Sequence, residues 1–228
     1  MTLLHIETST NVCSIALSKD GMCLLSLIDR QGQNHAALLS NFIRQAVEKA
    51  QELNIVIEGI AVSGGPGSYT GLRIGVSTAK GLCYGYEIPL VAVDTLEVLC
   101  NHPIVRQQAD EESLLCPMID ARRMEVYAAV YTHSFEKRQK ISAKIISENS
   151  FCEELNSGVV CFFGNGAEKC KTILAHHPQA RFIEGIEPLA ENMILLGEKK
   201  FYENDFVDVA YYEPLYLKEF QTTTPKAR

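Results

Sequence analysis

Residues 63–75 read Ser-Gly-Gly-Pro-Gly-Ser-Tyr-Thr-Gly-Leu-Arg-Ile-Gly. They follow a short apolar segment, residues 60–62, that is typical of a buried strand, and from Thr70 onward the apolar residues take helical spacing. The glycines therefore lie at a strand-to-helix turn, where the backbone can approach another group closely. Because the first amides of a helix are unpaired and partly positive, such a turn is a natural anion site. The alternative is a tight turn whose glycines only allow chain reversal and close helix packing.

The turn matches none of three well-known motifs. A Walker loop would end in Gly-Lys-Ser or Gly-Lys-Thr, whereas the only basic residue at the start of this helix is Arg73. A dinucleotide-binding fingerprint would have a third glycine where this chain has Thr70. A hydrolase nucleophile elbow around Ser68 would need glycines at the positions of Pro66 and Thr70. The turn alone therefore identifies neither a nucleotide-binding enzyme nor a serine hydrolase.

The composition is that of an ordinary globular protein. Of 228 residues, 46% are hydrophobic and 21% are charged, which suits one large domain or two small lobes. The formal net charge of −7 argues against a broad basic surface for nucleic acid but leaves room for a local patch. No apolar run reaches membrane-spanning length, and the first residues lack the basic region of a signal peptide. We expect a cytoplasmic protein with no membrane contact.

The eight cysteines mostly lie in apolar segments and form no Cys-x-x-Cys pair. This spacing excludes a zinc ribbon, and the absence of a secretory segment argues against a disulfide framework. We expect reduced thiols in the core.

Strand-like and helical segments follow the same order in both halves of the chain. In the first half they are residues 3–7, 12–17 and 22–28 (strands), 34–53 (helix), 57–62 (strand), 70–86 (helix) and 90–93 (strand). In the second half, strand-like segments at 114–119, 126–131, 144–147 and 159–163 repeat this order less regularly. The pattern predicts an α/β fold of two similar lobes, each with a mixed sheet and flanking helices.

The boundary between the lobes is expected near residues 101–103, because a helix that begins at Thr95 must stop before Pro103. A later helix over residues 188–202 starts with proline, which is favoured in a first helical turn. We assign residues 1–102 to an N-terminal lobe, 103–220 to a C-terminal lobe that includes the later helix, and 221–228 to a frayed polar tail.

Several segments carry a more specific resemblance. They are Leu-His-Ile-Glu-Thr-Ser-Thr at 4–10, Asn-His-Ala-Ala-Leu-Leu at 34–39, Gly-Pro-Gly-Ser-Tyr-Thr-Gly-Leu-Arg-Ile-Gly at 65–75 and Ile-Pro-Leu-Val-Ala-Val at 88–93. Looser matches follow at 118–122 and 213–217. These segments resemble the bacterial TsaB (YeaZ) family. The resemblance implies an actin-like ATPase fold of the ASKHA, ribonuclease H-like class.

The same resemblance implies a role in RNA modification. The implied function is that of an accessory subunit in making N6-threonylcarbamoyladenosine at position 37 of tRNAs that read codons starting with A. The implied partners are a TsaD-type catalytic paralogue, which transfers the threonylcarbamoyl group, and a TsaE-type small ATPase. The chain is expected to form a homodimer when alone and to associate with tRNA only indirectly.

The residues favour an accessory role over a catalytic one. The resemblance implies a His-x-x-x-His metal pair in the catalytic paralogue, on the helix after residues 90–93, where this chain has Thr95 and Leu99. Leucine cannot bind a metal, and a lone threonine hydroxyl is a poor ligand. The histidines are otherwise scattered or, at 176–177, adjacent and so directed to different sides of a helix. We predict no metal site, no catalytic residues and no cofactor.

The helix over residues 70–86 contains four glycines, Gly71, Gly75, Gly81 and Gly85. Each costs up to about 1 kcal/mol relative to alanine. Close packing of the helix on its own sheet would account for them, and so would close packing on a partner. The second interpretation predicts a partner-binding surface of Tyr69, Leu72, Arg73, Gly75, Val76, Ala79 and Lys80, flanked by His35, Leu38, Leu39 and Phe42.

An actin-like cleft would lie between the lobes, lined by the turns at residues 8–10, 120–122 and 164–166. The predicted nucleotide-binding residues are Thr8, Ser9, Thr10, Gly65, Gly67, Asp120 and Gly164. We do not expect a working ATPase, because Glu7 is followed by uncharged residues where an active phosphotransferase would have a metal-binding aspartate. Two other function classes stay open. An independent ATPase or kinase would release phosphate, and a metalloprotease-like hydrolase would bind zinc or iron.

Overall fold

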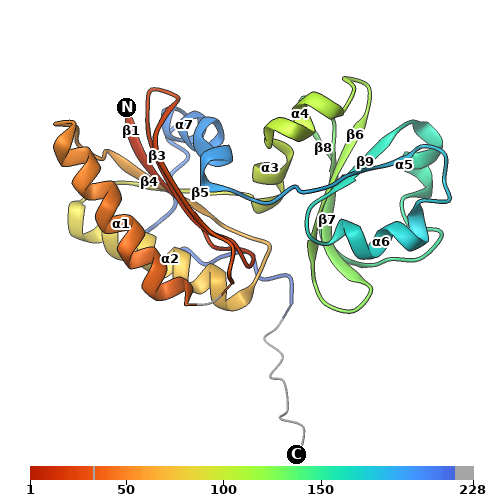
Figure 1. Cartoon of the computed structure of the whole chain (residues 1–228), viewed down its shortest axis with the longest axis horizontal. Helices are drawn as coiled ribbons and strands as arrows, with labels where there is room; N and C mark the ends of the chain where they lie inside the picture. The colour runs from red at the N-terminus through yellow and green to blue at the C-terminus, as the bar shows by residue number, and fades with distance from the viewer. Residues whose placement is uncertain (33, 219–228) are drawn as a thin grey trace, which may run out of the picture.

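The computed structural model describes residues 1–32 and 34–218, which form two five-stranded sheets (Figure 1). The first sheet has the order β3-β2-β1-β4-β5, from β1 (Thr2–Glu7), β2 (Cys13–Lys19), β3 (Met22–Asp29), β4 (Gly59–Ser63) and β5 (Leu90–Val93). The second has the order β8-β7-β6-β9-β10, from β6 (Leu114–Asp120), β7 (Glu125–Tyr131), β8 (Lys137–Ile145), β9 (Val160–Phe163) and β10 (Ala180–Ile183). Each order places the first strand of its lobe at the centre. The predicted repeat is therefore confirmed, as is the actin-like ATPase fold.

β1 is buried along its whole length at the centre of the first sheet. It pairs antiparallel with β2 and parallel with β4, with Ile6 opposite Val62. Since parallel strands end at the same edge of a sheet, the turn after Glu7 and the glycine-rich turn after Ser63 begin side by side. This edge faces the second lobe.

Two long helices, α1 (His35–Glu52) and α2 (Tyr69–Tyr86), cover one face of the first sheet (Figure 1). Both match their predicted ranges to within one residue. α1 begins after Asn34, which has a left-handed backbone with φ of 61°. α2 begins after Ser68, whose hydroxyl accepts a hydrogen bond from the amide of Gly71 at 3.3 Å, as expected of a serine N-cap.

The second lobe follows the prediction less closely. β6, β7 and β9 lie at the predicted segments, whereas β8 begins well before residue 144 and β10 was not predicted. β8 is mostly charged or polar, and its pairing with β7 shifts register, so it lacks the regular apolar alternation that marks a strand. The helices α5 (Cys152–Ser157) and α6 (Ala167–Leu174) complete this lobe.

All eight cysteines are free thiols and six of them are buried, which confirms their predicted place in the core. Within the described ranges, no helix is both long and apolar enough to cross a membrane.

The end of the chain returns to the first lobe. After α3 (Thr95–Cys100), α4 (Pro103–Gln108) and the second sheet, the 3-10 helix η1 (Ala190–Met193) and α7 (Ile194–Tyr202) pack on β1 and β5. Met193, Leu196 and Phe201 contact a cluster of Ala61, Val91 and Val93 on the sheet face opposite α1 and α2. The sequence analysis assigned the later helix to the C-terminal lobe, whereas its apolar side covers the first sheet. The tail assigned to 221–228 lies outside the described residues.

Glu198 links α7 to the β2–β3 hairpin through hydrogen bonds. Its carboxylate accepts hydrogen bonds from the amide of Gly21 at 2.8 Å and from the hydroxyl of Ser18 at 3.3 Å, and the residue is only 7% exposed. We expect Glu198→Ala to lower the free energy of unfolding by about 1–2 kcal/mol, because both donors lose their acceptor. Urea denaturation measures the loss, with exposed Glu203→Ala as the control. Equal losses in the two variants would contradict this role.

Candidate functional site

A cleft of about 690 Å³ lies between the lobes, at the carboxyl ends of their central strands. Its first wall consists of the turn after β1 and the glycine-rich turn after β4. Its second wall consists of the turns after β6 and β9, and residues 215–218 form a third side. The lining residues are Ser9, Thr10, Asn11 and 66–70 on the first wall, 119–123, Glu125, Tyr127 and Asn165 on the second, and 215–218. This volume is within the range of small-molecule sites.

Close backbone packing builds the first wall. The amide of Ser68 donates a hydrogen bond to the carbonyl oxygen of Ser9 at 2.6 Å, and a Cβ on Gly67 would lie 2.3 Å from the same oxygen. Only glycine therefore fits at position 67. α2 begins at this point, and its first residues, Tyr69 and Thr70, line the cleft. The partly positive end of the helix thus faces the space between the lobes.

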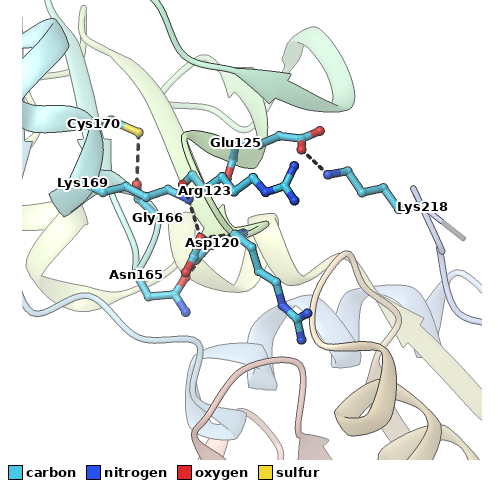
Figure 2. Close-up of polar contacts among 9 residues, drawn as sticks. Asp120, Arg123, Glu125, Asn165, Gly166, Lys169, Cys170 and Lys218 are labelled. Carbon is cyan, nitrogen blue, oxygen red and sulfur yellow. Dashed lines mark hydrogen bonds and ion pairs between the residues drawn. The ribbon is translucent and has the colours of Figure 1, made fainter. Parts of the chain in front are cut away.

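Figure 2 shows a network centred on Lys169 of α6 in the second wall. The Lys169 ammonium contacts the Asp120 carboxylate and donates hydrogen bonds to the carbonyl oxygens of Arg123 and Glu125, both at 2.7 Å. Asp120 also accepts a hydrogen bond from the amide of Arg122 at 2.8 Å. The side chains of Lys169 and Asp120 are 23% and 46% exposed. The ammonium therefore neutralises the carboxylate at the end of β6.

Arg122 and Arg123 lie at the β6–β7 turn and line the cleft. Both have a left-handed backbone, with φ of 69° and 52°, which residues other than glycine rarely adopt. Both are exposed, and across residues 1–32 and 34–218 neither guanidinium has a hydrogen-bond or ion-pair partner. The Glu125 carboxylate, by contrast, pairs with Lys218 (Figure 2). Each cleft carboxylate thus pairs with a lysine, while the guanidinium groups of Arg122 and Arg123 have no ion-pair partner among the described residues.

Glu7 ends β1 behind the first wall and is fully buried. One of its carboxylate oxygens, Oε1, accepts a hydrogen bond from the amide of Ser9 at 2.6 Å. Burial raises the pKa of this carboxyl to about 7, although hydrogen bonds from Ser9 and Ser63 act to lower it. Glu7 does not line the cleft. It is therefore a buried structural carboxyl that a ligand in the cleft does not reach.

The actin-like fold implies a nucleotide bound with a metal, and the residues here do not fit the metal. In the part of the chain that the structure describes, no three His, Cys, Asp or Glu side chains form a group that could hold a metal ion. Asp120 is already paired with Lys169. Thr95 and Leu99 are both 0% exposed. A metal-dependent step is not supported by these residues.

The cleft brings together four of the predicted nucleotide-binding residues, namely Ser9, Thr10, Gly67 and Asp120. Thr8, Gly65 and Gly164 were also predicted to bind nucleotide but do not line this cleft. The Thr8 hydroxyl donates a hydrogen bond to the carbonyl of Gly71 at 2.8 Å. Gly65 and Gly164 have positive φ values of 98° and 96° and pack against backbone oxygens. These three residues shape the turns beneath the cleft.

Arg123 and Lys218 line the cleft and Lys169 binds Asp120 beside it, yet none of the three was among the predicted site residues. Arg123 follows the predicted turn at 120–122 directly, so extending that turn by one residue would have included it. Lys169 is 49 residues from Asp120 in sequence. No local sequence pattern predicts this contact, because it depends on how α6 packs beside β6.

The predicted partner-binding residues divide into two groups. Leu39, Leu72, Gly75, Val76 and Ala79 are buried within the first lobe, where they are not exposed for contact with a partner. Tyr69, Arg73, Lys80, His35, Leu38 and Phe42 are at least partly exposed. The prediction combined both sides of each helix, because apolar spacing does not tell a stripe that covers a sheet from its neighbouring positions.

The glycines of α2 also divide into two pairs. A Cβ on Gly71 or Gly75 would lie 2.0 Å or 2.2 Å from oxygens of Thr8, so these two residues pack on the first lobe itself. Gly81 and Gly85 have nothing within 4 Å of such a Cβ. Packing on the sheet therefore explains the first pair and leaves the second pair unexplained.

The second pair belongs to a surface that the sequence analysis missed. Tyr84 lies beside these glycines on α2 and is 83% exposed. A shallow groove of about 590 Å³ is lined by Lys80, Gly81 and Tyr84 together with residues 208–210. The spacing of Gly81, Tyr84 and Gly85 at three and four residues could have indicated a common helix side.

Comparison with known proteins places this chain among tRNA-modification proteins. Residues 29–219 match the family model described as TsaD: tRNA N6-adenosine threonylcarbamoyltransferase. The tRNA threonylcarbamoyladenosine biosynthesis protein TsaB of Escherichia coli strain K12 is 29% identical over 226 residues, which cover 96% of this chain and 95% of that protein. The tRNA N6-adenosine threonylcarbamoyltransferase of Trichlorobacter lovleyi is 34% identical over 113 residues, 42% of this chain and 33% of that protein.

A solved structure agrees with these relatives. It is described as an uncharacterized protein with similarity to peptidase YEAZ from Pseudomonas aeruginosa, and it covers 95% of this chain and 99% of its own with 26% identity and a TM-score of 0.78. The match thus extends over both lobes and confirms the resemblance drawn from the glycine-rich turn. The chain belongs to the TsaD family and, within it, to the TsaB (YeaZ) proteins.

Proposed function

We propose that this chain is a non-catalytic partner subunit that binds and activates a TsaD-type transferase. The reaction is threonylcarbamoylation of adenosine 37 in tRNAs that read codons starting with A. The observation that carries the proposal is the burial of Thr95 and Leu99 in α3, where the resemblance puts the metal-binding histidines of the catalytic paralogue. A chain with the family fold but without those ligands is suited to assist the transfer rather than perform it.

The outer side of α2 is the proposed partner surface, defined by Gly81, Tyr84 and Gly85. Glycines inside an exposed helix each cost about 1 kcal/mol, and no contact within the described part of this chain requires the glycines at 81 and 85. Without a Cβ, these positions allow the backbone of a partner helix to come close. Tyr84 supplies an exposed aromatic side chain of the kind that carries binding energy at interfaces.

The relationship to the transferase favours a symmetric mode of contact. A paralogue of the same fold has an equivalent helix, so the two subunits can meet about a pseudo-two-fold axis. The same surface would allow a homodimer when this chain is alone. A TsaE-type small ATPase would join the pair, and tRNA would be held mainly by the other subunits because this chain carries a net charge of −7. We place the complex in the cytoplasm.

The test is threonylcarbamoyl transfer to tRNA in a reconstituted mixture of the transferase, the small ATPase and a separate synthase that makes the threonylcarbamoyl adenylate. We expect incorporation of labelled threonine to require this chain, and Tyr84→Ala to reduce it about tenfold or more through loss of an interface aromatic. The matched control is Tyr202→Ala, which removes a 66% exposed tyrosine from α7 on the opposite face of the sheet and should keep full activity.

Other results would overturn the proposal. Transfer that is indifferent to this chain would remove the activating role. Phosphate release by the isolated chain would favour an independent ATPase or kinase, and stoichiometric zinc or iron would favour a hydrolase.

A further inference from the structure

Lys169 occupies a cage made of oxygen atoms. Its three partners are the Asp120 carboxylate and the carbonyl oxygens of Arg123 and Glu125, the last two at 2.7 Å (Figure 2). Carboxylate and carbonyl oxygens are the ligands that hard divalent cations prefer. Here the cation is an ammonium group attached to α6. It therefore occupies the place at the end of β6 where these three oxygens would otherwise attract a cation from solution.

The charges of the cleft then favour an anion. Its two carboxylates, Asp120 and Glu125, are each paired with a lysine. The guanidinium groups of Arg122 and Arg123 have no such partner within the described residues, although the whole chain carries a net charge of −7. The N-terminal end of α2 adds partial positive charge from the first wall. Positive charge thus exceeds negative charge without any metal ion.

We propose that the cleft binds a small phosphate-bearing molecule without a divalent metal. Arg122 and Arg123 contact its phosphate oxygens, because the planar guanidinium fork matches that geometry. Lys169 supplies the positive charge that a metal provides in metal-dependent phosphate sites. The cleft of about 690 Å³ is sized for a small molecule rather than for a nucleic acid strand. This site is separate from the α2 surface and does not depend on the proposed partner role.

The first arm of the test is titration calorimetry with tripolyphosphate in the presence of EDTA. We expect one binding site on the unmodified chain. Arg122→Ala and Arg123→Ala should each weaken binding about tenfold, as expected when one charge-assisted contact is lost. The matched control is Arg138→Ala, which removes an exposed arginine of β8 outside the cleft and should leave the affinity unchanged.

The second arm tests the role of the ammonium. Lys169→Ala leaves the Asp120 carboxylate unpaired, so binding in EDTA should fall about tenfold or more. Excess Mg²⁺ should restore it, because the metal can enter the vacated oxygen cage, whereas Mg²⁺ should not strengthen binding to the unmodified chain. Lys169→Met keeps most of the side-chain volume and serves if the alanine variant does not fold. The matched control is Lys171→Ala, which removes another lysine of α6, one that pairs with Glu184. Its affinity for tripolyphosphate should be the same with and without Mg²⁺.

Three results would overturn the proposal. They are no binding of tripolyphosphate in EDTA, binding to the unmodified chain that requires Mg²⁺, and Lys169 variants whose binding does not change with Mg²⁺. Binding of tRNA that depends on Arg122 and Arg123, in the absence of tripolyphosphate binding, would assign these arginines to RNA phosphates instead.

Discussion

Replacing Gly71 with alanine is expected to lower the free energy of unfolding by about 3 kcal/mol. The added Cβ would lie 2.0 Å from the carbonyl oxygen of Thr8, a backbone atom that cannot move aside as a flexible side chain can. The clash also disturbs the hydrogen bond from the Thr8 hydroxyl to the carbonyl of Gly71, 2.8 Å long. Either α2 or the end of β1 must shift. Urea denaturation followed by circular dichroism measures the loss.

The matched control is the same substitution at Gly81 in the same helix. A Cβ there has no atom within 4 Å, so Gly81→Ala should raise the free energy of unfolding by about 0.5–1 kcal/mol through helix propensity. Gly81→Ala should also weaken transferase activation if a partner backbone approaches this position. Equal stability changes at the two positions would show that the packing of α2 on Thr8 is not the constraint described here.

Replacing Glu7 with glutamine is expected to stabilise the protein by about 2–3 kcal/mol above pH 7 and to have little effect near pH 5. Burial raises the pKa of this carboxyl from 4.5 to about 7, so between these values the folded chain holds a proton that the unfolded chain has lost. Stability therefore falls as the pH rises through this window, at about 1.4 kcal/mol for each pH unit. Glutamine is neutral throughout and removes this dependence.

The measurement is urea denaturation of both proteins at about pH 5 and about pH 8. Burial also raises the pKa values of Asp94 and Glu97, but both groups are present in both proteins, so the difference between the proteins isolates Glu7. Exposed Glu203→Gln is the control and should leave the pH dependence as it is. A Glu7→Gln variant with the same pH dependence as the unmodified chain would mean that Glu7 is already ionised in the folded state.

The first lobe could be predicted from the sequence because its signals are local. α1 and α2 have regular apolar spacing and clear N-terminal residues in Asn34 and Ser68, and the one strand between them, β4, contains a continuous apolar run at residues 60–62. The second lobe has weaker signals. Charged residues mark β8, and β10 is only four residues long, so neither shows a pattern that single-sequence reasoning can rely on.

The parts that could not be predicted depend on contacts between distant segments. Apolar spacing identified α7 as a helix but did not say which sheet it covers, since the apolar side fits either lobe. Similarly, the turn at Asp120 was expected in the cleft, but its charge partner Lys169 comes from a helix whose direction is set by packing. The buried and open glycines of α2 also look alike in sequence, and only their neighbours in space distinguish Gly75 from Gly85.

Because α7 packs on the first sheet, the second lobe can fold before the first lobe during synthesis, whereas N-terminal domains usually fold first. The second lobe, with the helix α3 that packs on it, is formed by residues 95–186 as one continuous stretch, so this lobe can fold as soon as it leaves the exit tunnel. The first lobe must wait for α7, which starts at Ile194, about a hundred residues after β5 ends at Val93. At about 5–20 residues per second, this delay lasts roughly 5–20 s. Throughout that time the newly made strands β4 and β5 expose Ala61, Val91 and Val93, so a nascent chain stalled in this interval is the form most in need of chaperone protection.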